Sequence, residues 1–341
     1  MTPKGRFLSA LGRDMPDRIP TMHIQLGGGN HLQDVTGLTI RDAYSDPRKF
    51  AQMCLATREF GFDNIMVGWG DLLNEAQAFG VQLSFPNDRD YPRGTPIRPE
   101  EIDKLEYIDP NEDRIWSASL EAAKIINGKV GSEVAVIGQV SDPFTLAASV
   151  RGFDGLLMDE IMEPDRTHHL LKVLTDSLTE YGRLLKDRSG VEIIYIEDGS
   201  ADSEQNEFQL AKTFDIDYAQ TMAEGFHRVG LMTILSNCAK GAYLEAQFEA
   251  VKPTAIHTSF DWEGYPNAVS ILRGKGCLAA GLLPHFIARS NPDEIRQKVS
   301  ELIRSSGDGS GLIVTSAGEI PFDAPLENVK ALARATDLSK E

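Results

Sequence analysis

Residues 231–241 read Leu231-Met-Thr-Ile-Leu-Ser-Asn-Cys238-Ala-Lys-Gly241, an apolar run of strand length that ends in a small polar turn with a cysteine at its tip. Seven further runs have the same form, and helical segments separate them. Strand-length runs that alternate with helices favour a parallel sheet. Eight such units predict an α/β fold of the closed (β/α)8 type, a TIM barrel. The other runs begin at Thr21, Phe62, Glu133, Glu192, Ala255, Cys277 and Gly311.

The length of 341 residues fits one barrel domain over residues 1–341. Phe7, Leu8 and Leu11 have helical spacing and predict a helix that caps the barrel near the N-terminus. Residues 74–111 are rich in Asn, Asp, Pro and Arg and have weak periodicity. We interpret them as an excursion from the barrel.

Charge and hydropathy exclude two classes of partner. The formal net charge is -17 at pH 7, so a nucleic-acid backbone or an anionic membrane surface would be repelled. No apolar run approaches the roughly 18 residues of a membrane span, and no signal-peptide pattern follows Met1. Three widely spaced cysteines, without a CxxC pair, favour neither a disulfide framework nor a zinc ribbon. We therefore expect a cytoplasmic protein with no nucleic-acid or membrane partner.

Polar residues that end the apolar runs are the candidate site residues, because the loops after the strands of a barrel meet at one mouth. Cys238 could be a thiolate ligand or a nucleophile, or simply a packed thiol. Asp198 could be a general acid or base, or a helix N-cap. His257 could be a base or a metal ligand, or a hydrogen-bonded structural residue. We take Asp198, Cys238 and His257 as candidate catalytic residues, and Cys238 also as the candidate metal ligand.

A second set of residues near the predicted mouth is assigned to substrate binding. Trp69 and Phe144 would offer aromatic surface to a ligand, although aromatic residues belong to the core in most positions. Glu319 follows the last strand, and the alternative for it is a solvent-exposed acid. The candidate substrate-binding residues are Gln25, Trp69, Phe144, His285 and Glu319.

Four motifs lie in order along nearly the whole chain: Thr2-Pro-Lys-Gly-Arg-Phe-Leu-Ser-Ala-Leu11 with Pro16-Asp-Arg-Ile-Pro20, Ile196-Glu-Asp198, Ile234-Leu-Ser-Asn-Cys238, and Ser316-Ala-Gly-Glu-Ile-Pro321 with Ala324-Pro-Leu-Glu-Asn328. They resemble the ordered motifs of the uroporphyrinogen decarboxylase superfamily. This superfamily includes methylcobamide:coenzyme M methyltransferases and corrinoid-dependent O-demethylases. The resemblance implies a (β/α)8 barrel, which agrees with the count of apolar runs.

The chain departs from the superfamily at two sites. In the coenzyme M methyltransferases, a His-x-Cys pair and a distant cysteine bind zinc, which activates a thiol as its thiolate. The corresponding positions here are Ser236, Cys238 and Gly318, so one ligand of three is retained. The decarboxylases carry an arginine-bearing stretch after the first strand for a polycarboxylate substrate, and residues 24–30 contain no arginine. The resemblance therefore implies a degenerate zinc site and disfavours porphyrinogen decarboxylation.

The resemblance then favours a methyltransferase of the O-demethylase type. Such an enzyme would move a methyl group from a small methoxylated compound, aromatic ones included, to a corrinoid carrier or to tetrahydrofolate. No DxHxxG corrinoid-binding pattern occurs in the chain, so cobalamin would arrive on a partner protein. By family analogy we expect a homodimer. Two alternatives stay open: a decarboxylase or related lyase that acts on a small acid, and a binding protein that kept the barrel without catalysis.

Overall fold

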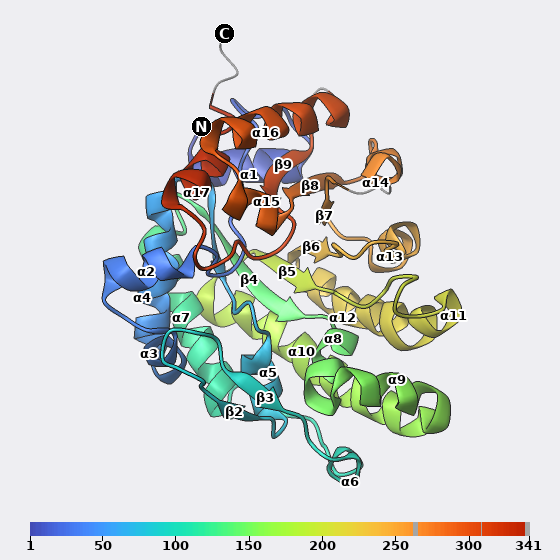
Figure 1. Cartoon of the computed structure of the whole chain (residues 1–341). Helices are drawn as coiled ribbons and strands as arrows, with labels where there is room; N and C mark the ends of the chain where they lie inside the picture. Colours follow the sequence, from blue (N-terminus) through green and yellow to red (C-terminus); the bar gives the residue numbers. More distant parts are fainter. Residues whose placement is uncertain (262–264, 308, 338–341) are drawn as a thin grey trace.

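The computed structural model describes residues 1–261, 265–307 and 309–337, in which seven parallel strands curl inside a layer of helices (Figure 1). Each strand pairs with the next one along the chain, in the order β1-β4-β5-β6-β7-β8-β9. This order is that of a barrel wall built from consecutive strand–helix units. The strands are β1 (Asn64–Val67), β4 (Ala135–Ser141), β5 (Ile193–Glu197), β6 (Met232–Ser236), β7 (Ala255–Ser259), β8 (Cys277–Leu282) and β9 (Leu312–Ser316).

An extended segment, residues 20–24, takes the place of the eighth strand between β9 and β1. Thr21 forms a single parallel bridge with Val314, and the Met22 N–H donates to the Val314 carbonyl at 2.8 Å. On the other side, the Asn64 side-chain amide accepts from the His23 N–H at 2.7 Å and donates to the His23 carbonyl at 2.9 Å. The predicted barrel is confirmed, and the first of its eight apolar runs joins β1 through a side chain.

The interior of the barrel is filled by alternate residues of the strands, because successive side chains of a strand point to opposite faces. Ile137, Tyr195 and Ile234 belong to this inner cluster. Phe7 of α1 (Pro3–Leu11) packs in the same cluster, and the Lys4 N–H donates to the Glu133 carbonyl just before β4. Helix α1 therefore covers the N-terminal end of the barrel. The carboxyl ends of the strands form the opposite end, which we call the mouth.

The outward-facing side chains of the strands pack against the helices in a second, larger apolar cluster. No helix of the described residues is both long and apolar enough to cross a membrane. The remaining helical elements are α2 (Gly29–Thr36), α3 (Ile40–Ser45), α4 (Pro47–Ala56), η1 (Thr57–Phe60), α5 (Leu73–Ala78), α6 (Pro99–Ile102), α7 (Arg114–Val130), α8 (Pro143–Arg151), α9 (Phe153–Met162), α10 (Pro164–Ser189), α11 (Phe208–Leu210), the π-helix η2 (Ala211–Ile216), α12 (Asp217–Arg228), α13 (Leu244–Val251), α14 (Tyr265–Leu272), α15 (Pro284–Arg289), α16 (Pro292–Ser306) and α17 (Leu326–Ala333).

Residues 74–111 run between β1 and β4, and they include an antiparallel hairpin of β2 (Gln82–Ser84) and β3 (Arg93–Thr95). Tyr91 lies in the connection between these two short strands. Its hydroxyl accepts a hydrogen bond from the Gly70 N–H at 3.1 Å, directly after β1. The hairpin segment is thus tied back to the mouth of the barrel (Figure 1).

A buried ion cluster joins the N-terminal segment to the barrel wall. Asp63, which is 1% exposed, accepts from Arg6 Nη1 at 2.6 Å and from Arg18 Nη1 at 2.8 Å. It also accepts the Thr21 N–H at 2.9 Å. Arg6 comes from α1 and Arg18 from the Pro-Asp-Arg-Ile-Pro motif. One carboxylate therefore holds both the capping helix and the segment that closes the ring.

Candidate active site

The inward-facing residues at the mouth include a histidine with three side-chain neighbours. His257 lies on the inward face of β7. Its Nδ1 is 2.8 Å from the Tyr195 hydroxyl and 3.0 Å from the Ser236 hydroxyl. Cys238 Sγ lies 3.6 Å from His257 Nε2. The same Nε2 lies 2.9 Å from the Ser316 carbonyl oxygen. Because a carbonyl only accepts, Nε2 carries the proton and Nδ1 is left to accept from a hydroxyl.

Burial keeps this group of side chains uncharged. It lowers the pKa of His257 to about 4, against a weaker opposing effect of the Ser316 carbonyl. It also raises the pKa of Cys238 well above its ordinary value, and the charge of Glu197 adds to that effect. At neutral pH the pair is therefore an imidazole beside a thiol, and the thiol is not activated as a nucleophile.

Glu197, at the end of β5, is the acid that faces the interior beside this pair. It follows the inward-facing Tyr195 by two residues, which puts both on the same face of the strand. Burial raises the pKa of Glu197 to about 7, although the Tyr195 hydroxyl lowers it. A carboxyl with a pKa near neutrality can hold a proton in the resting enzyme and release it during a reaction.

Glu319 forms a second acidic group at the mouth. Its Oε1 accepts from the Tyr91 hydroxyl at 2.8 Å and from the Leu26 N–H at 2.9 Å. Burial raises the pKa of Glu319 to about 8, and the nearby charges of Asp71 and Glu197 raise it further against these hydrogen bonds. Asp71 in turn accepts from the Tyr44 hydroxyl at 2.6 Å. Residues from the loop after β9, from the loop after β1 and from the hairpin segment thus meet at the mouth.

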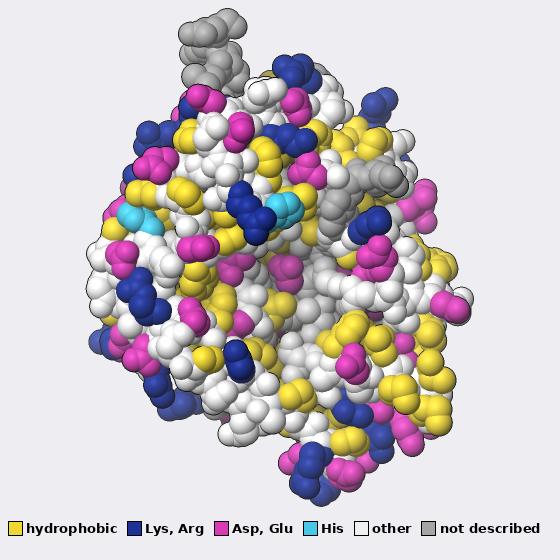
Figure 2. Space-filling model, in the orientation of Figure 1, with side chains coloured by type: hydrophobic (Ala, Val, Ile, Leu, Met, Phe, Trp, Pro, Cys, Tyr) yellow, Lys and Arg dark blue, Asp and Glu magenta, His cyan; other side chains and the backbone are white. Residues whose placement is uncertain are grey.

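Several buried polar atoms at the mouth have no hydrogen-bond partner. They are both amide atoms of Gln139, the hydroxyl of Ser141 and Oε2 of Glu197. Buried polar groups are nearly always paired in folded proteins, and an unpaired one costs about 1–3 kcal/mol. The space-filling view shows a hollow at the centre of the molecule, with acidic side chains inside it (Figure 2). A polar ligand in this hollow could pair with the free groups.

Glycine in the loop after β1 makes room for these side chains. A Cβ at Gly68 would lie 2.5 Å from Gln139 Cβ, and a Cβ at Gly70 would overlap the Glu319 carboxylate. The contact at Gly68 involves the first atom of the Gln139 side chain, so rotation of the amide cannot relieve it. The glycines therefore let Gln139 and Glu319 approach the end of β1.

We expect Gly68→Ala to destabilise the protein by about 1–3 kcal/mol, because it forces an overpacked contact with Gln139. Gly128→Ala is the matched control, since nothing outside the local helix backbone lies within 4 Å of a Cβ added there, in the last turn of α7. That change should stabilise by about 0.5–1 kcal/mol. Urea unfolding of both variants measures the difference. An unchanged urea midpoint for Gly68→Ala would show that Gln139 can move away from the added Cβ without loss of stability.

The structure brings Cys238, His257 and Glu319 to the mouth, but it places Asp198 differently. Asp198 follows Glu197 and points to the other face of β5, where its Oδ1 accepts from the N–H groups of Ser200 and Ala201. It is 1% exposed and lies with other aspartates rather than with Cys238 and His257. The inward acid of this motif is Glu197, and the catalytic assignment of Asp198 stays a prediction that its position does not favour.

The predicted substrate-binding residues are spread over different environments. Trp69 stacks on Phe50 with ring centroids 4.1 Å apart and is 4% exposed, so it is largely core. Phe144 is 1% exposed and belongs to the outer apolar cluster. Gln25 is buried next to Leu26, the residue whose N–H binds Glu319. His285 is exposed on α15. Of this set, Glu319 lies at the mouth with Glu197 as a charged neighbour.

Four site residues were absent from the candidate set: Glu197, Tyr195, Gln139 and Tyr91. Glu197 and Gln139 end apolar runs just as Asp198 does, so the choice among neighbours depended on which face each one occupies. Period-two alternation puts Glu197 on the same face of the strand as Tyr195, but it does not show which face is inward. No signal in the sequence placed Tyr91, because it belongs to a hairpin in a segment with weak periodicity.

The raised carboxyl pKa values predict that the free energy of unfolding falls as the pH rises from about 6 to 8.5. Glu197 and Glu319 have pKa values of about 7 and about 8 when folded, above their ordinary 4.5. The folded state therefore holds more protons than the unfolded state in this window, and raising the pH favours unfolding. His257, with its pKa lowered to about 4, acts in the opposite direction only below about pH 6.5. The decline begins near pH 4.5, where the carboxyls of the unfolded chain start to ionise, and His257 partly offsets it up to about pH 6.5.

Urea unfolding at pH 6 and pH 8.5 measures this decline, and Glu319→Gln should reduce it by roughly 1–3 kcal/mol because the group no longer ionises. The exposed Glu100→Gln serves as the control for general surface charge. A decline of the same size in wild type and Glu319→Gln would show that Glu319 ionises normally in the folded protein.

The residues present do not fit the zinc site that the family resemblance implies. Structural and catalytic zinc sites use at least three protein ligands of the His, Cys and carboxylate types. Cys238 and His257 lie close together, but Ser236 and Gly318 stand at the other expected positions. Within the described residues, the group of three or more such side chains that could surround an ion consists of aspartates and excludes Cys238. A thiol-activating zinc centre therefore lacks its ligands here.

A parallel barrel with titratable side chains at the carboxyl ends of its strands is the architecture of a TIM-barrel enzyme. The family model described as "Uroporphyrinogen decarboxylase (URO-D)" matches residues 2–338. The chain therefore belongs to the uroporphyrinogen decarboxylase family. The motifs at both ends of the chain and the order of the strands agree with this membership.

The similar proteins include methyltransferases and decarboxylases. The methylcobamide:CoM methyltransferase MtaA of Methanosarcina barkeri is 25% identical over 98% of both chains. A uroporphyrinogen decarboxylase of Anaeromyxobacter dehalogenans is 25% identical over 97% of both chains. A solved structure, a methyltransferase from Methanosarcina mazei, superposes with a TM-score of 0.88 at 22% identity and covers 100% of both chains. This structural likeness establishes the shared fold.

Proposed function

We propose that the protein is a methyltransferase of the O-demethylase type, which takes a methyl group from a small methoxylated compound, aromatic ones included, and passes it to a corrinoid carrier or to tetrahydrofolate. The relatives named as methylcobamide:CoM methyltransferases support methyl transfer and a corrinoid. The observation that carries the oxygen-bound donor is the pairing of a protonatable Glu197 with a neutral, unactivated Cys238.

The geometry supports transfer of a methyl group away from an oxygen better than transfer of a methyl group onto a thiol. A thiol acceptor needs conversion to its thiolate, and the ligands of the zinc ion that would do this are missing at Ser236 and Gly318. An alkoxide or phenoxide, by contrast, leaves readily only if a proton reaches it. Glu197 holds such a proton near neutral pH and has an unpaired oxygen at the mouth.

The reaction can be followed through the side chains of this chain. Gln139 and Ser141 would pair their free donor and acceptor atoms with the donor compound and orient it. As the carbon–oxygen bond breaks, its electron pair stays on the oxygen, and Glu197 supplies the proton that neutralises it. A reduced corrinoid, when present, supplies the nucleophile that accepts the methyl group. Burial and the charge of Asp198 would keep Glu197 protonated, against the hydrogen bond from the Tyr195 hydroxyl, which favours the ionised form.

Partners follow from the same proposal. Because the chain has no DxHxxG pattern, the corrinoid would be carried by a separate protein that docks at the mouth. The methyl donor would be neutral, since acidic side chains occupy the hollow and the net charge is -17. The homodimer expected by family analogy stays a prediction, which sedimentation of the purified protein would test.

The experiment mixes the purified protein with a panel of methoxyarenes and other methyl ethers, together with either a reduced corrinoid protein or tetrahydrofolate. Methylcobalamin is followed by its absorbance, and methyltetrahydrofolate and the demethylated alcohol by chromatography. Candidate small acids are tested in parallel for release of carbon dioxide, which would favour the decarboxylase alternative. Tight donor binding without turnover would favour the non-catalytic alternative. Formation of demethylated product with neither acceptor methylated would contradict the proposed transfer.

A further inference from the structure

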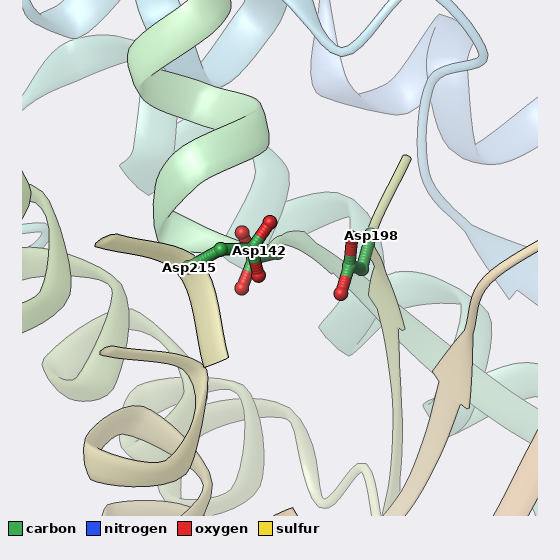
Figure 3. A group of neighbouring side chains, drawn as sticks. All are labelled: Asp142, Asp198 and Asp215. Atoms are coloured by element: carbon green, nitrogen blue, oxygen red, sulfur yellow. The ribbon is translucent and has the colours of Figure 1, made fainter. Parts of the chain in front are cut away.

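Three aspartates from three different elements meet on the outer side of the barrel wall, behind the candidate active site. Asp142 is the N-cap of α8, Asp198 follows β5, and Asp215 lies in the π-helix η2. One carboxylate oxygen from each lies within 4.8 Å of the other two (Figure 3). A stretch of sequence from position 142 to position 215 thus presents three acids to one point.

The groups that donate hydrogen bonds to these three carboxylates are neutral. Asp142 Oδ1 accepts from the Phe144 N–H at 2.7 Å, and the Ser200 hydroxyl donates to Asp215 Oδ2 at 2.9 Å. Asp198 accepts from backbone N–H groups and from the Gln247 side-chain amide. In the described part of the chain, none of the three carboxylates forms an ion pair with Lys, Arg or His. Three negative charges without a cation would be strongly unfavourable at this burial.

Two oxygens of the cluster also lack any hydrogen-bond partner. Asp142 Oδ2 and Asp215 Oδ1 are buried and unpaired, and the two residues are 0% and 1% exposed. Each residue uses its other oxygen for a hydrogen bond, so the unpaired oxygens are available to a ligand that accepts lone pairs. Such oxygens are rare in folded proteins, and an unplaced ion is a standard explanation. This observation is independent of the closeness of the three acids.

We infer that Asp142, Asp198 and Asp215 bind one hard divalent cation, with calcium the best fit. Carboxylate oxygen ligands favour calcium, magnesium or manganese over zinc. Two oxygens that share one calcium ion lie at most about 5 Å apart, twice the calcium–oxygen distance of about 2.3–2.6 Å. The 4.8 Å limit in the cluster meets this condition, whereas magnesium at about 2.1 Å would require the oxygens to move closer.

A cation here would have a structural role that is separate from methyl transfer. It would tie the end of β5 to the first turn of α8 and to the π-helix, an element type that often occurs at functional sites. The alternative to a cation is protonation: burial raises the pKa of Asp142 and Asp215, and the charge of Asp198 raises both further. Glu160 and Asp202 add negative charge near the cluster. Calcium binding therefore distinguishes a cluster neutralised by an ion from one neutralised by protons.

The experiment uses the full chain, treated with EDTA and then freed of it. Equilibrium dialysis with radioactive calcium should show one ion per chain at saturation. Differential scanning fluorimetry should show that calcium at about 100 times its Kd raises Tm by about 4 °C, with a smaller rise for magnesium. Asp215→Asn and Asp142→Asn should each abolish both effects.

Asp154→Asn is the control for loose binding to an acidic surface, because Asp154 is an exposed acid on α9. It should keep the calcium-dependent rise in Tm. If Asp142→Asn fails to fold, the test is the comparison of calcium binding by the wild type and by the Asp215→Asn variant in equilibrium dialysis. The inference is overturned if the wild type binds no calcium or magnesium saturably, or if Asp215→Asn responds to calcium as the wild type does.

Discussion

Glu197→Gln is expected to lower the rate of methyl transfer by about 100- to 10,000-fold, the range in which a general acid contributes to catalysis. Glutamine keeps the size and the hydrogen-bonding shape of the side chain but has no proton to give to a leaving oxygen. The effect should appear in kcat more than in KM, because the proton is needed only as the carbon–oxygen bond breaks. Single-turnover formation of the demethylated alcohol measures it.

The pH dependence of the wild type supplies a second readout of the same prediction. Since burial raises the pKa of Glu197 to about 7, the rate should fall as the pH rises above about 7 and the carboxyl loses its proton. Glu75→Gln is the matched control: Glu75 is also buried with a pKa of about 7, but it accepts from the Ser141 N–H and packs beside Trp116 and Tyr181. A loss of rate as large in Glu75→Gln would point to general disturbance of the barrel.

Asp63→Asn should lower the free energy of unfolding by about 3–5 kcal/mol, because it leaves two arginines beside an uncharged amide in a buried site. Asp63 is 1% exposed and accepts from Arg6, from Arg18 and from the Thr21 N–H. An amide presents one acceptor oxygen, so at least one arginine loses its charged partner. Urea unfolding monitored by circular dichroism measures the change.

Asp17→Asn is the matched control for this prediction, since Asp17 pairs with the same Arg6 at 2.7 Å while its side chain is 41% exposed. An exposed ion pair contributes about 0–1 kcal/mol, so this variant should unfold close to the wild-type midpoint. Equal losses in the two variants would show that burial of Asp63 is unimportant and that Arg6 alone secures the capping helix.

These contacts show what two of the family motifs do in the structure. Asp17 and Arg18 of the Pro-Asp-Arg-Ile-Pro motif bind Arg6 and Asp63, so the motif secures the end of the barrel opposite the mouth. The Ser-Ala-Gly-Glu motif places Glu319 at the mouth, where the Leu26 N–H and the Tyr91 hydroxyl hold it. The first motif is therefore structural, and the last one belongs to the candidate site.

Hydrophobic patterning alone predicts the barrel and the end of the barrel that carries the candidate site. Eight apolar runs separated by helices leave few other ways to bury their surface, and the polar residues after each run must share one mouth. On this basis the pattern predicts that Cys238, His257 and Glu319 share the mouth, and the structure brings His257 within 3.6 Å of Cys238.

Strand pairing, and not the pattern of residues, selects which of two neighbouring acids faces the barrel interior. The run Ile193-Ile-Tyr-Ile196 is buried on both faces, one against the barrel interior and one against the helices, so it has no polar face to set the phase of the alternation. A shift of one residue exchanges Glu197 for Asp198, and the pairing of β5 with β4 and β6 settles it. Tyr91 likewise reaches Glu319 through a hairpin, and Asp215 reaches the other two aspartates through a π-helix. No periodic pattern in the sequence predicts either element.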